Sequence, residues 1–222
     1  MKKVVSILMI DDHPSQIEGY KVILHYNKSG FEIDTTAIFN SHRAYDVITN
    51  DKYSSSFDVC FLDRSLPIYA EKNIKSGEDL AVLLKKHMPK TKIVMLTSHS
   101  EAFVLYHIVK KLEPAGLLVK CDFTAEELLI AFDKIMKGET YHSETVKESM
   151  RDLLSKEEYL DAYNRQIIML LSQGIKTKNI PEHLNLSQST VEKRKVQIKN
   201  YFCIEKGTDE DIVKEAKRMG FI

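Results

Sequence analysis

The chain has 222 residues, of which 43% are hydrophobic, and its 32 basic side chains balance its 32 acidic ones. This length predicts two domains of ordinary size, each with its own core, and the neutral balance excludes a chain that is polycationic or polyanionic throughout. No apolar run approaches the roughly 20 residues that cross a bilayer, and the Met-Lys-Lys start does not lead into a signal-peptide core. We therefore expect a cytoplasmic protein without a membrane partner.

Strand-like and helix-like segments alternate through the first 138 residues. Five strand-helix units of this kind predict an α/β fold, a doubly wound parallel sheet of five strands in the flavodoxin-like order 2-1-3-4-5 with right-handed crossovers. The predicted strands are Val4–Ile10, Glu32–Phe39, Phe57–Leu62, Lys92–Thr97 and Gly116–Lys120, and the predicted helices are Pro14–Tyr26, Ser41–Thr49, Gly77–His87, Glu101–Leu112 and Ala125–Lys137.

The last of these helices carries clear end signals. Thr124 and Glu127 have the spacing of a capping box, and Gly138 stands where a helix of this length ends. The stretch that follows is polar and rich in Ser, Glu and Lys, which is typical of a linker. We therefore predict one domain over residues 1–138, a linker over 139–155 and a second domain over 156–222.

Polar side chains follow the predicted strands where each strand ends. Asp11 and Asp12 come after the first strand, Asp63 after the third, Thr97 at the end of the fourth and Lys120 after the fifth. Ligands bind at the carboxyl ends of the strands in such sheets, so these groups should converge. Clustered carboxylates favour Mg²⁺, which prefers oxygen ligands and shares them with phosphate. Asp63 is then a candidate nucleophile toward a phosphoryl donor, with Mg²⁺ and Lys120 neutralising the transferring group.

At these residues the first domain resembles the receiver domain of bacterial two-component response regulators. The family pattern is an acidic pair after strand one, a phospho-accepting Asp with Pro four residues on, a Thr or Ser after strand four and a Lys after strand five. The chain has these elements in order as Asp11-Asp12, Asp63 with Pro67, Thr97 and Lys120.

The resemblance implies a specific assignment of roles. Asp63 is phosphorylated by a partner sensor histidine kinase, and Mg²⁺ is held by Asp12, Asp63 and the backbone carbonyl of Arg64, with Asp11 assisting. Thr97 and Lys120 are the switch residues that bind the phosphoryl group. A receiver of this kind accepts a phosphoryl group and is not a turnover enzyme.

The chain departs from the family pattern at two places. The family has Tyr or Phe three residues before the strand-five Lys, where this chain has Leu117. Phe103 or Tyr106 could substitute for that aromatic, and both are also compatible with an ordinary helix surface or core. The segment Ile68–Ser76 is longer than the loop of the family and borders the site, so it either adjusts access to Asp63 or is a plain surface loop.

The second domain has an all-helical pattern. Apolar residues recur at helical spacing from Tyr159 to Leu171 and stop before Gly174, a candidate C-cap. A short helix from about Thr177 to Leu184 and a longer helix to about Phe202 follow, and Ser187 is the natural N-cap of the longer one. Two helices joined by a tight turn predict a helix-turn-helix.

Positive charge is concentrated on this motif. Residues 176–199 contain six basic and two acidic side chains, a local charge of +4, which suits DNA phosphates. The order of residues through Lys178, Ile180 and Thr190 resembles the LuxR-type helix-turn-helix, and Thr208–Ile222 is similar to its closing helix, although Glu192 replaces a commonly basic residue. The predicted base contacts are Lys193 and Gln197, and the predicted phosphate contacts are Lys178, Thr190, Arg194 and Lys199.

Taken together, the two resemblances imply a response regulator. Phosphorylation of Asp63 would control dimerisation and binding of double-stranded DNA, and hence transcription. A signalling adaptor whose output domain binds protein remains an alternative, because Glu192 and the modest total charge leave room for it. A Mg²⁺-dependent phosphatase is the weaker alternative, because such enzymes carry an acid catalyst two residues after the nucleophile, where this chain has Ser65.

Overall fold

The computed structural model describes residues 3–156, 160–202, 204, 207–218 and 221–222. The chain divides into two compact units. The first unit comprises Met1–Glu101 and Leu105–Glu148, and the second comprises Ala102–Val104 and Ser149–Ile222. The predicted contribution of Tyr159 to the second unit lies outside the described residues.

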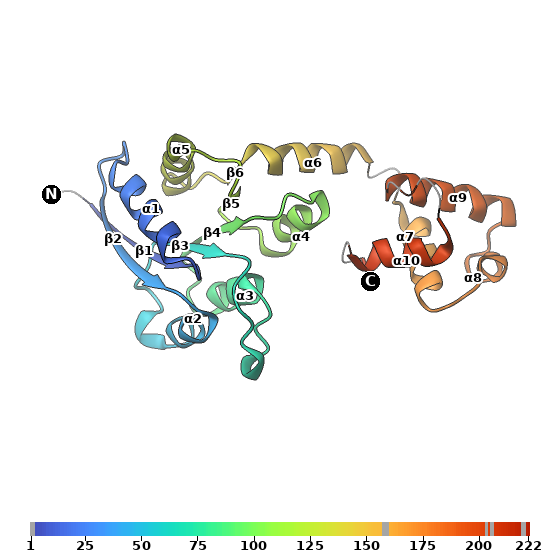
Figure 1. Cartoon of the computed structure of the whole chain (residues 1–222), viewed down its shortest axis with the longest axis horizontal. Coiled ribbons are helices and arrows are strands. Elements are labelled where there is room, and N and C mark those ends of the chain that lie inside the picture. Colours follow the sequence, from blue (N-terminus) through green and yellow to red (C-terminus); the bar gives the residue numbers. More distant parts are fainter. Residues whose placement is uncertain (1–2, 157–159, 203, 205–206, 219–220) are drawn as a thin grey trace. The chain divides into compact units, whose positions relative to one another are not determined.

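The first unit is built on a parallel sheet in the order β2-β1-β3-β4-β5-β6 (Figure 1). The predicted order is confirmed, but the prediction of five strands was short by one. The added strand is only two residues long, too short to leave an apolar run in the sequence. The Tyr141 amide donates to the Ala115 carbonyl, and the amide of Ser143, the next residue after the strand, donates to the Leu117 carbonyl. The strands are β1 (Val4–Ile10), β2 (Glu32–Ile38), β3 (Val59–Asp63), β4 (Lys92–Thr97), β5 (Gly116–Val119) and β6 (Tyr141–His142).

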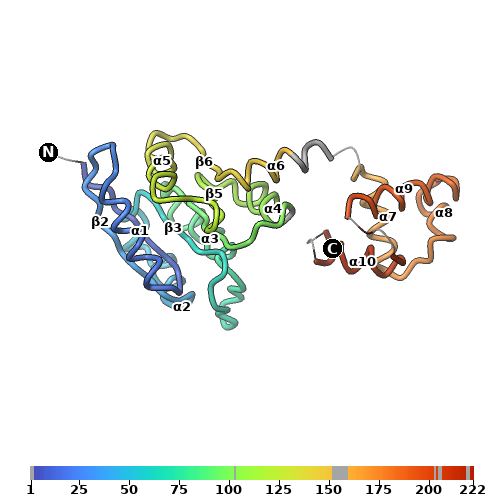
Figure 2. Tube along the Cα trace, turned by 45° about the horizontal axis from the view of Figure 1, so that its top comes forward, coloured from blue at the N-terminus to red at the C-terminus, as the bar shows by residue number. Residues whose placement is uncertain are grey.

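Helices cover both faces of this sheet, as the turned view in Figure 2 also shows. Helices α1 and α5 lie together on one face, and α2 and α3 lie together on the other. The predicted capping box of Thr124 and Glu127 is confirmed, and Ser76 and Asp79 form a second one. The helices are α1 (Pro14–His25), α2 (Ser41–Ile48), α3 (Gly77–His87), α4 (Ala102–Leu112), α5 (Ala125–Met136) and α6 (Glu144–Lys156).

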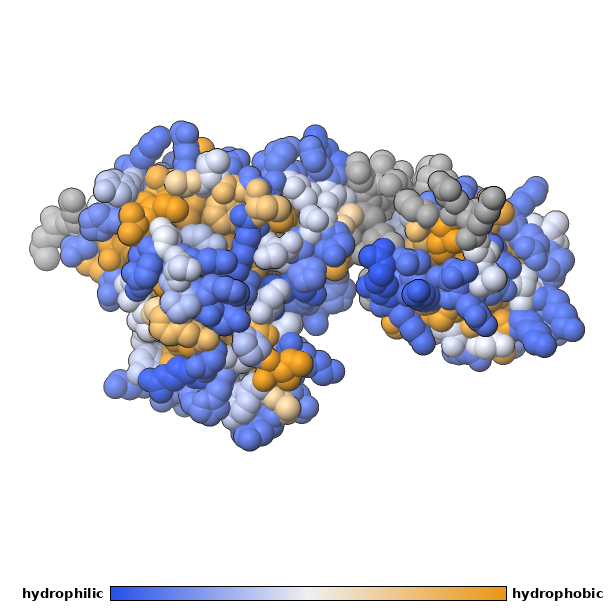
Figure 3. Space-filling model, viewed as in Figure 1, coloured by the Kyte–Doolittle hydropathy of each residue, from blue (hydrophilic) through white to orange (hydrophobic). Residues whose placement is uncertain are grey.

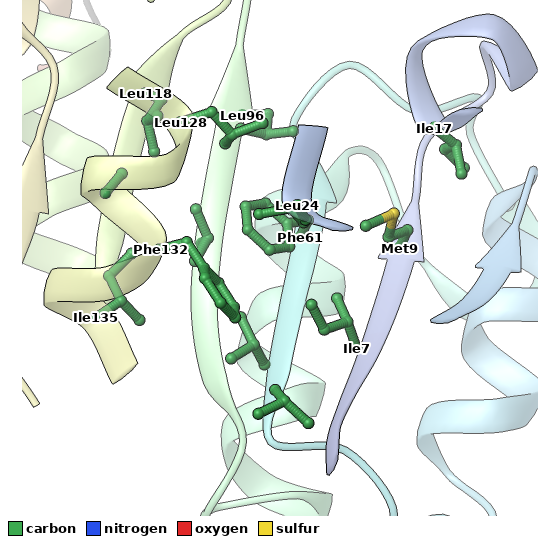
Figure 4. Close-up of a cluster of buried hydrophobic side chains, with 14 residues drawn as sticks. Ile7, Met9, Ile17, Leu24, Phe61, Leu96, Leu118, Leu128, Phe132 and Ile135 are labelled. Atoms are coloured by element: carbon green, nitrogen blue, oxygen red, sulfur yellow. The ribbon is translucent and has the colours of Figure 1, made fainter. Parts of the chain in front are cut away.

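Alternation along the strands explains why both faces are covered. Ile7, Met9 and Phe61 point into a cluster beneath α1 and α5, where they meet Leu24 and Phe132 (Figure 4). Successive side chains of a strand point to opposite faces, and the residues between them are buried as well. Strands buried on both faces read as continuous apolar runs, which is why the sequence predicted them closely.

The predicted linker is partly regular structure. Residues 139–155 contain β6 and most of α6, and the division between the two units falls within α6, after Glu148. The polar composition of this stretch conceals the helix, because only one side of it is apolar. Val146, on that side, is fully buried.

The long segment after Pro67 is an ordered hairpin. Tyr69 and Ile74 pair across it with backbone hydrogen bonds of 2.8 and 3.1 Å, and Ile74 is buried. The Tyr69 ring packs edge-on against His42 of α2, with 5.0 Å between ring centroids, and the Ser41 hydroxyl donates to the Pro67 carbonyl. The hairpin is therefore attached to α2 as a defined part of the surface.

The second unit is a helical bundle that contains the predicted helix-turn-helix. Gly174 ends α7 with a φ of +81°, and Ser187 caps α9 by accepting from the Thr190 amide. Ile167, Ile180 and Val191 belong to its buried core. Its elements are α7 (Ala162–Ser172), the 3₁₀ turn η4 (Thr177–Asn179), α8 (Ile180–Leu184), α9 (Gln188–Tyr201) and α10 (Asp209–Arg218).

The visible face of both units in Figure 3 is mostly hydrophilic, with small groups of hydrophobic side chains between the polar ones. Among the helices of the described residues, none has both the length and the apolar character that crossing a membrane requires.

One glycine holds α3 close to the end of β3, and its replacement should destabilise the first unit. A Cβ on Gly77 would lie 2.0 Å from the Asp63 carbonyl oxygen and 3.1 Å from the Arg64 Cα. Backbone cannot yield as a flexible side chain can, so we expect Gly77→Ala to lower the free energy of unfolding by about 1–3 kcal/mol. Exchange of the core amides of β1 and β3 measures this for the unit itself.

Gly19 is the matched control, because it lies within α1 and its Cβ would meet nothing within 4 Å. We expect Gly19→Ala to raise the free energy of unfolding by about 0.5–1 kcal/mol. Equal effects of the two substitutions would contradict the close approach at Gly77.

Candidate functional site

The predicted polar residues converge at the carboxyl edge of the sheet. Asp63 is the last residue of β3, Thr97 is the last of β4, and Asp11 and Lys120 follow β1 and β5 directly. Asp11 and Asp63 are each 2% exposed and Thr97 is fully buried. The register of the parallel strands therefore brings together residues that are up to 109 positions apart in the chain.

Lys120 connects the two buried carboxylates. Its Nζ lies 2.8 Å from Asp11 Oδ2 and 3.0 Å from Asp63 Oδ1, while its backbone amide donates to the Thr97 carbonyl at 2.7 Å. One ammonium cannot neutralise two carboxylates, so the site keeps excess negative charge. Burial raises the pKa of Asp63, the Lys120 ammonium opposes this shift, and the Asp11 carboxylate adds to it.

Two buried carboxylate oxygens keep spare acceptor capacity. Asp63 Oδ1 and Asp12 Oδ1 have no hydrogen-bond partner among the described residues, although the Lys120 Nζ lies 3.0 Å from the first oxygen and the His13 Nδ1 lies 2.9 Å from the second. Buried acceptors are normally satisfied, and oxygen donors of this charge suit a hard divalent cation. The donor set of Asp11, Asp12 and Asp63 therefore fits a metal of the magnesium type.

His13 is a neighbour of this site that the sequence reasoning missed. Its Nδ1 lies 2.9 Å from Asp12 Oδ1 and 3.2 Å from Asp11 Oδ1, and its side chain is 60% exposed. Asp11 Oδ1 also accepts from the His13 backbone amide at 2.9 Å. Its position directly after the acidic pair was the available signal.

Arg64 has other partners than the predicted one. Its carbonyl accepts from the Gly77 amide at 2.8 Å, and its Nε donates to Glu78 Oε1 at 2.8 Å. The backbone of α3 therefore already uses the carbonyl that we predicted as a metal ligand. A carbonyl oxygen has two lone pairs, so the role of Arg64 as a metal ligand stays a prediction beside the three carboxylates.

Leu117 is fully buried in the sheet, where the family pattern has an aromatic residue. Of the two candidate substitutes, Tyr106 is half-buried on α4, with the Lys110 Nζ 5.6 Å from its ring centroid. The side chain of Phe103 lies outside the described part of the structure. Thr97 is in the predicted place, and its Oγ1 accepts from the His99 amide at 3.0 Å.

In the second unit, several basic side chains of α9 are bound by groups of the same unit. Arg194 pairs with Asp161 at 2.6 Å, and Lys195 pairs with Asp209 at 2.6 Å. The Lys199 Nζ donates to the Gly207 carbonyl at 2.6 Å. Arg194 and Lys199 were predicted as phosphate contacts, which stays a prediction; their observed contacts join α9 to neighbouring segments of its own unit.

Other predicted contacts remain on the surface. Lys178, Lys193 and Gln197 are exposed, whereas Thr190 is half-buried and its hydroxyl lies 2.8 Å from the hydroxyl of the N-cap residue Ser187. The structure adds two exposed residues to the same surface of α9, Glu192 and Val196. Val196 is 57% exposed although it is apolar, and helical spacing alone did not single it out.

Comparison with known proteins agrees with the geometry of the first unit. Residues 7–133 match the family described as response regulator receiver domain. The oxygen regulatory protein NreC of Staphylococcus epidermidis is 28% identical over 207 residues, which cover 87% of this chain and 89% of that protein. NreC of Staphylococcus haemolyticus is 28% identical over 212 residues, with the same coverage.

Solved structures extend the likeness in fold over the whole chain. The RcsB response regulator of Salmonella typhimurium superposes with a TM-score of 0.70 at 19% identity, covering 96% of this chain and 99% of that one. A structure of RcsB in complex with DNA gives a TM-score of 0.65 at 19% identity, covering 97% and 98%. At these identities the likeness concerns the fold.

The raised pKa of Asp63 predicts a pH dependence of stability. The folded chain favours the protonated carboxyl, so stability is lost as the pH rises through the pKa of Asp63 in the folded state. We expect Asp63→Asn to raise the free energy of unfolding at neutral pH. The difference should vanish below about pH 3.9, where the unfolded chain also binds the proton. Urea unfolding at the two pH values measures it.

Asp58 provides the control. It directly precedes β3, at the opposite end of the strand from Asp63, and its exposed carboxylate accepts from the Ser6 amide at 2.9 Å. Asp58→Asn should give no gain in stability at neutral pH. A gain equal to that of Asp63→Asn would show that the effect does not come from the buried site.

Proposed function

The chain belongs to the response regulator receiver family, and on that premise we propose that it is a two-component response regulator. Asp63 takes a phosphoryl group from a sensor histidine kinase, and the second unit binds DNA in response. The observation that carries the proposal is the buried Asp63 carboxylate, held beside Asp11 by the ammonium of Lys120. Such a regulator acts in the cytoplasm, where its kinase domain and DNA are accessible.

The phosphoryl transfer follows from this geometry. An oxygen of the ionised Asp63 attacks the phosphorus of a phosphohistidine, the P–O bond forms as the P–N bond breaks, and the imidazole leaves. Lys120 can then bind the phosphoryl oxygens, and the Thr97 hydroxyl can donate to them. Asp12, Asp63 and the Arg64 carbonyl would hold Mg²⁺ with Asp11 assisting, and the ion would neutralise charge on the transferring group. The product carries about −1.5 to −2 charges.

The exposed surface of α9 supports the proposal of a DNA-binding output. A helix in the major groove reads bases with a few projecting side chains, and Glu192, Lys193, Val196 and Gln197 project from α9. The exposed lysines at 176 and 178 lie at the start of the motif and suit phosphates. Helix-turn-helix proteins generally bind paired half-sites as dimers, so we propose that phosphorylation promotes a homodimer.

An adaptor whose output unit binds a protein is the second candidate. The observation in its favour is that three basic side chains of α9 are already bound within the unit, by Asp161, Asp209 and the Gly207 carbonyl. Asp161 and Asp209 offset two of the positive charges of residues 176–199, while the bond to the Gly207 carbonyl fixes the position of Lys199 without changing its charge. The two candidates differ in the DNA-binding experiment below.

Phosphorylation should require Asp63, at the end of β3, and should not require Asp58, which lies just before β3. With acetyl phosphate and Mg²⁺, we expect the wild-type chain to gain one phosphoryl group by intact mass and Asp63→Asn to gain none. Asp58→Asn should be labelled like the wild type, because Asp58 lies at the opposite end of the segment from the site. Labelling of Asp63→Asn would remove Asp63 as the acceptor.

DNA binding should depend on the exposed lysines. We expect Lys178→Ala to weaken binding to all sequences and to reduce the slope of log affinity against log salt by about 0.9, the loss of one phosphate contact. Lys193→Ala should weaken binding and relax base preference, at a cost of about 1–3 kcal/mol. Selection from random duplexes followed by titration at several salt concentrations measures both effects.

Lys137, an exposed lysine after α5, is the matched control. Its replacement by Ala should leave affinity and salt slope unchanged. If the phosphorylated wild-type chain binds no duplex at low salt, the DNA-binding output is refuted and the adaptor is favoured.

A further inference from the structure

The start of α6 is fastened to the segment that follows the switch lysine. The Asp122 carboxylate accepts from the Thr145 backbone amide at 2.8 Å through Oδ2 and from the Thr145 hydroxyl at 2.8 Å through Oδ1. We call these two hydrogen bonds the Asp122 clasp. A carboxylate at this position satisfies a free amide of the first helical turn and interacts favourably with the helix dipole.

The residue before α6, Ser143, joins the start of the helix to β5. Ser143 is buried, and its Oγ accepts from the Val119 amide of β5 at 3.1 Å, while its own amide donates to the Leu117 carbonyl at 3.1 Å. Its hydroxyl therefore extends the sheet and does not cap the helix. Asp122, 23 residues away from Thr145, supplies the cap instead.

The charge of Asp122 fits this role. Its pKa is lowered, because hydrogen bonds from Ser143 and Thr145 outweigh the opposing effect of partial burial. The carboxylate is therefore ionised at neutral pH, as a charge-assisted cap requires.

Only one residue separates Asp122 from Lys120. The Lys120 amide is bound to the Thr97 carbonyl at 2.7 Å, and the Asp122 amide is bound to the Val119 carbonyl at 2.9 Å. These bonds fix both ends of a tight turn. A displacement of the Lys120 backbone would therefore also displace Asp122. Leu117, which lacks the ring of the family's usual switch residue, lies on the same strand.

We propose that the Asp122 clasp transmits the state of Asp63 to α6, and that phosphorylation opens it. This inference rests on the proposed function, because the stimulus is the phosphoryl group on Asp63. In this proposal Lys120 shifts from its position between Asp11 and Asp63 toward the new phosphoryl oxygens, and the turn moves Asp122 away from Thr145. The first turn of α6 loses its cap and frays, at the start of the helix that contains the division between the units.

The test compares amide exchange in the full chain before and after phosphorylation with acetyl phosphate and Mg²⁺, with intact mass confirming the modification. In the wild type, phosphorylation should speed exchange of the amides of residues 145–147 about fivefold, the ratio expected for loss of one N-cap. Asp122→Ala should exchange quickly in both states. Asp122→Asn, which keeps an acceptor oxygen, should retain a measurable response.

Thr124→Ala is the matched control, because it removes the cap of the neighbouring helix α5 and leaves the clasp intact. Its α6 response should equal that of the wild type. In parallel, DNA affinity should be measured before and after phosphorylation. In Asp122→Ala the two affinities should differ by no more than about twofold. Should this variant fail to fold, Thr145→Val removes only the hydroxyl half of the clasp and should reduce the response.

The outcomes separate the two proposals. Absence of phosphoryl uptake refutes the proposed function. Full uptake with unchanged exchange at 145–147, or a full affinity gain in Asp122→Ala, overturns the clasp and leaves the proposed function standing.

Discussion

The ammonium of Lys120 between two buried carboxylates is the interaction on which the rest of the site depends. Asp11 and Asp63 are each costly to bury as anions, and Lys120 reaches both at hydrogen-bonding distance. Removing the Lys120 ammonium would leave two uncompensated buried carboxylates, and loss of one partner of a buried ion pair is typically destabilising by about 3–5 kcal/mol, whereas loss of the Asp63 charge leaves Asp11 and Lys120 paired. The ends of β1, β3 and β5 are thereby coupled, so a change of charge at Asp63 cannot remain local to β3.

The sequence carried enough information for the sheet and for most of the site. Strands buried on both faces leave continuous apolar runs, and the polar residue that ends each run marks the functional edge. Asp63, Thr97 and Lys120 lie at that edge because three parallel strands end there. The strand β6 escaped prediction because backbone bonds define it, and the Arg64 carbonyl was assigned without knowing that the Gly77 amide binds it.

The helix-turn-helix shows a different limit of sequence reasoning. A count of charges gave residues 176–199 a local charge of +4, but it could not show where each base finds its partner. Arg194 pairs with Asp161, 33 positions earlier in the chain, and Lys195 pairs with Asp209. Basic side chains that stabilise the unit and basic side chains that are available to a partner look the same in the sequence. Only the tertiary contacts distinguish them.

The size of the Asp122 clasp limits what it can do alone. An N-cap contributes about 1 kcal/mol, so opening one clasp shifts a two-state equilibrium of α6 about fivefold. A transcriptional switch needs a larger ratio. In a dimer bound to paired half-sites the two shifts multiply, which gives about 25-fold if the clasps act independently. A weak clasp in each protomer is therefore sufficient when phosphorylation is read by a dimer, and the protein then does not need a large rearrangement around Leu117.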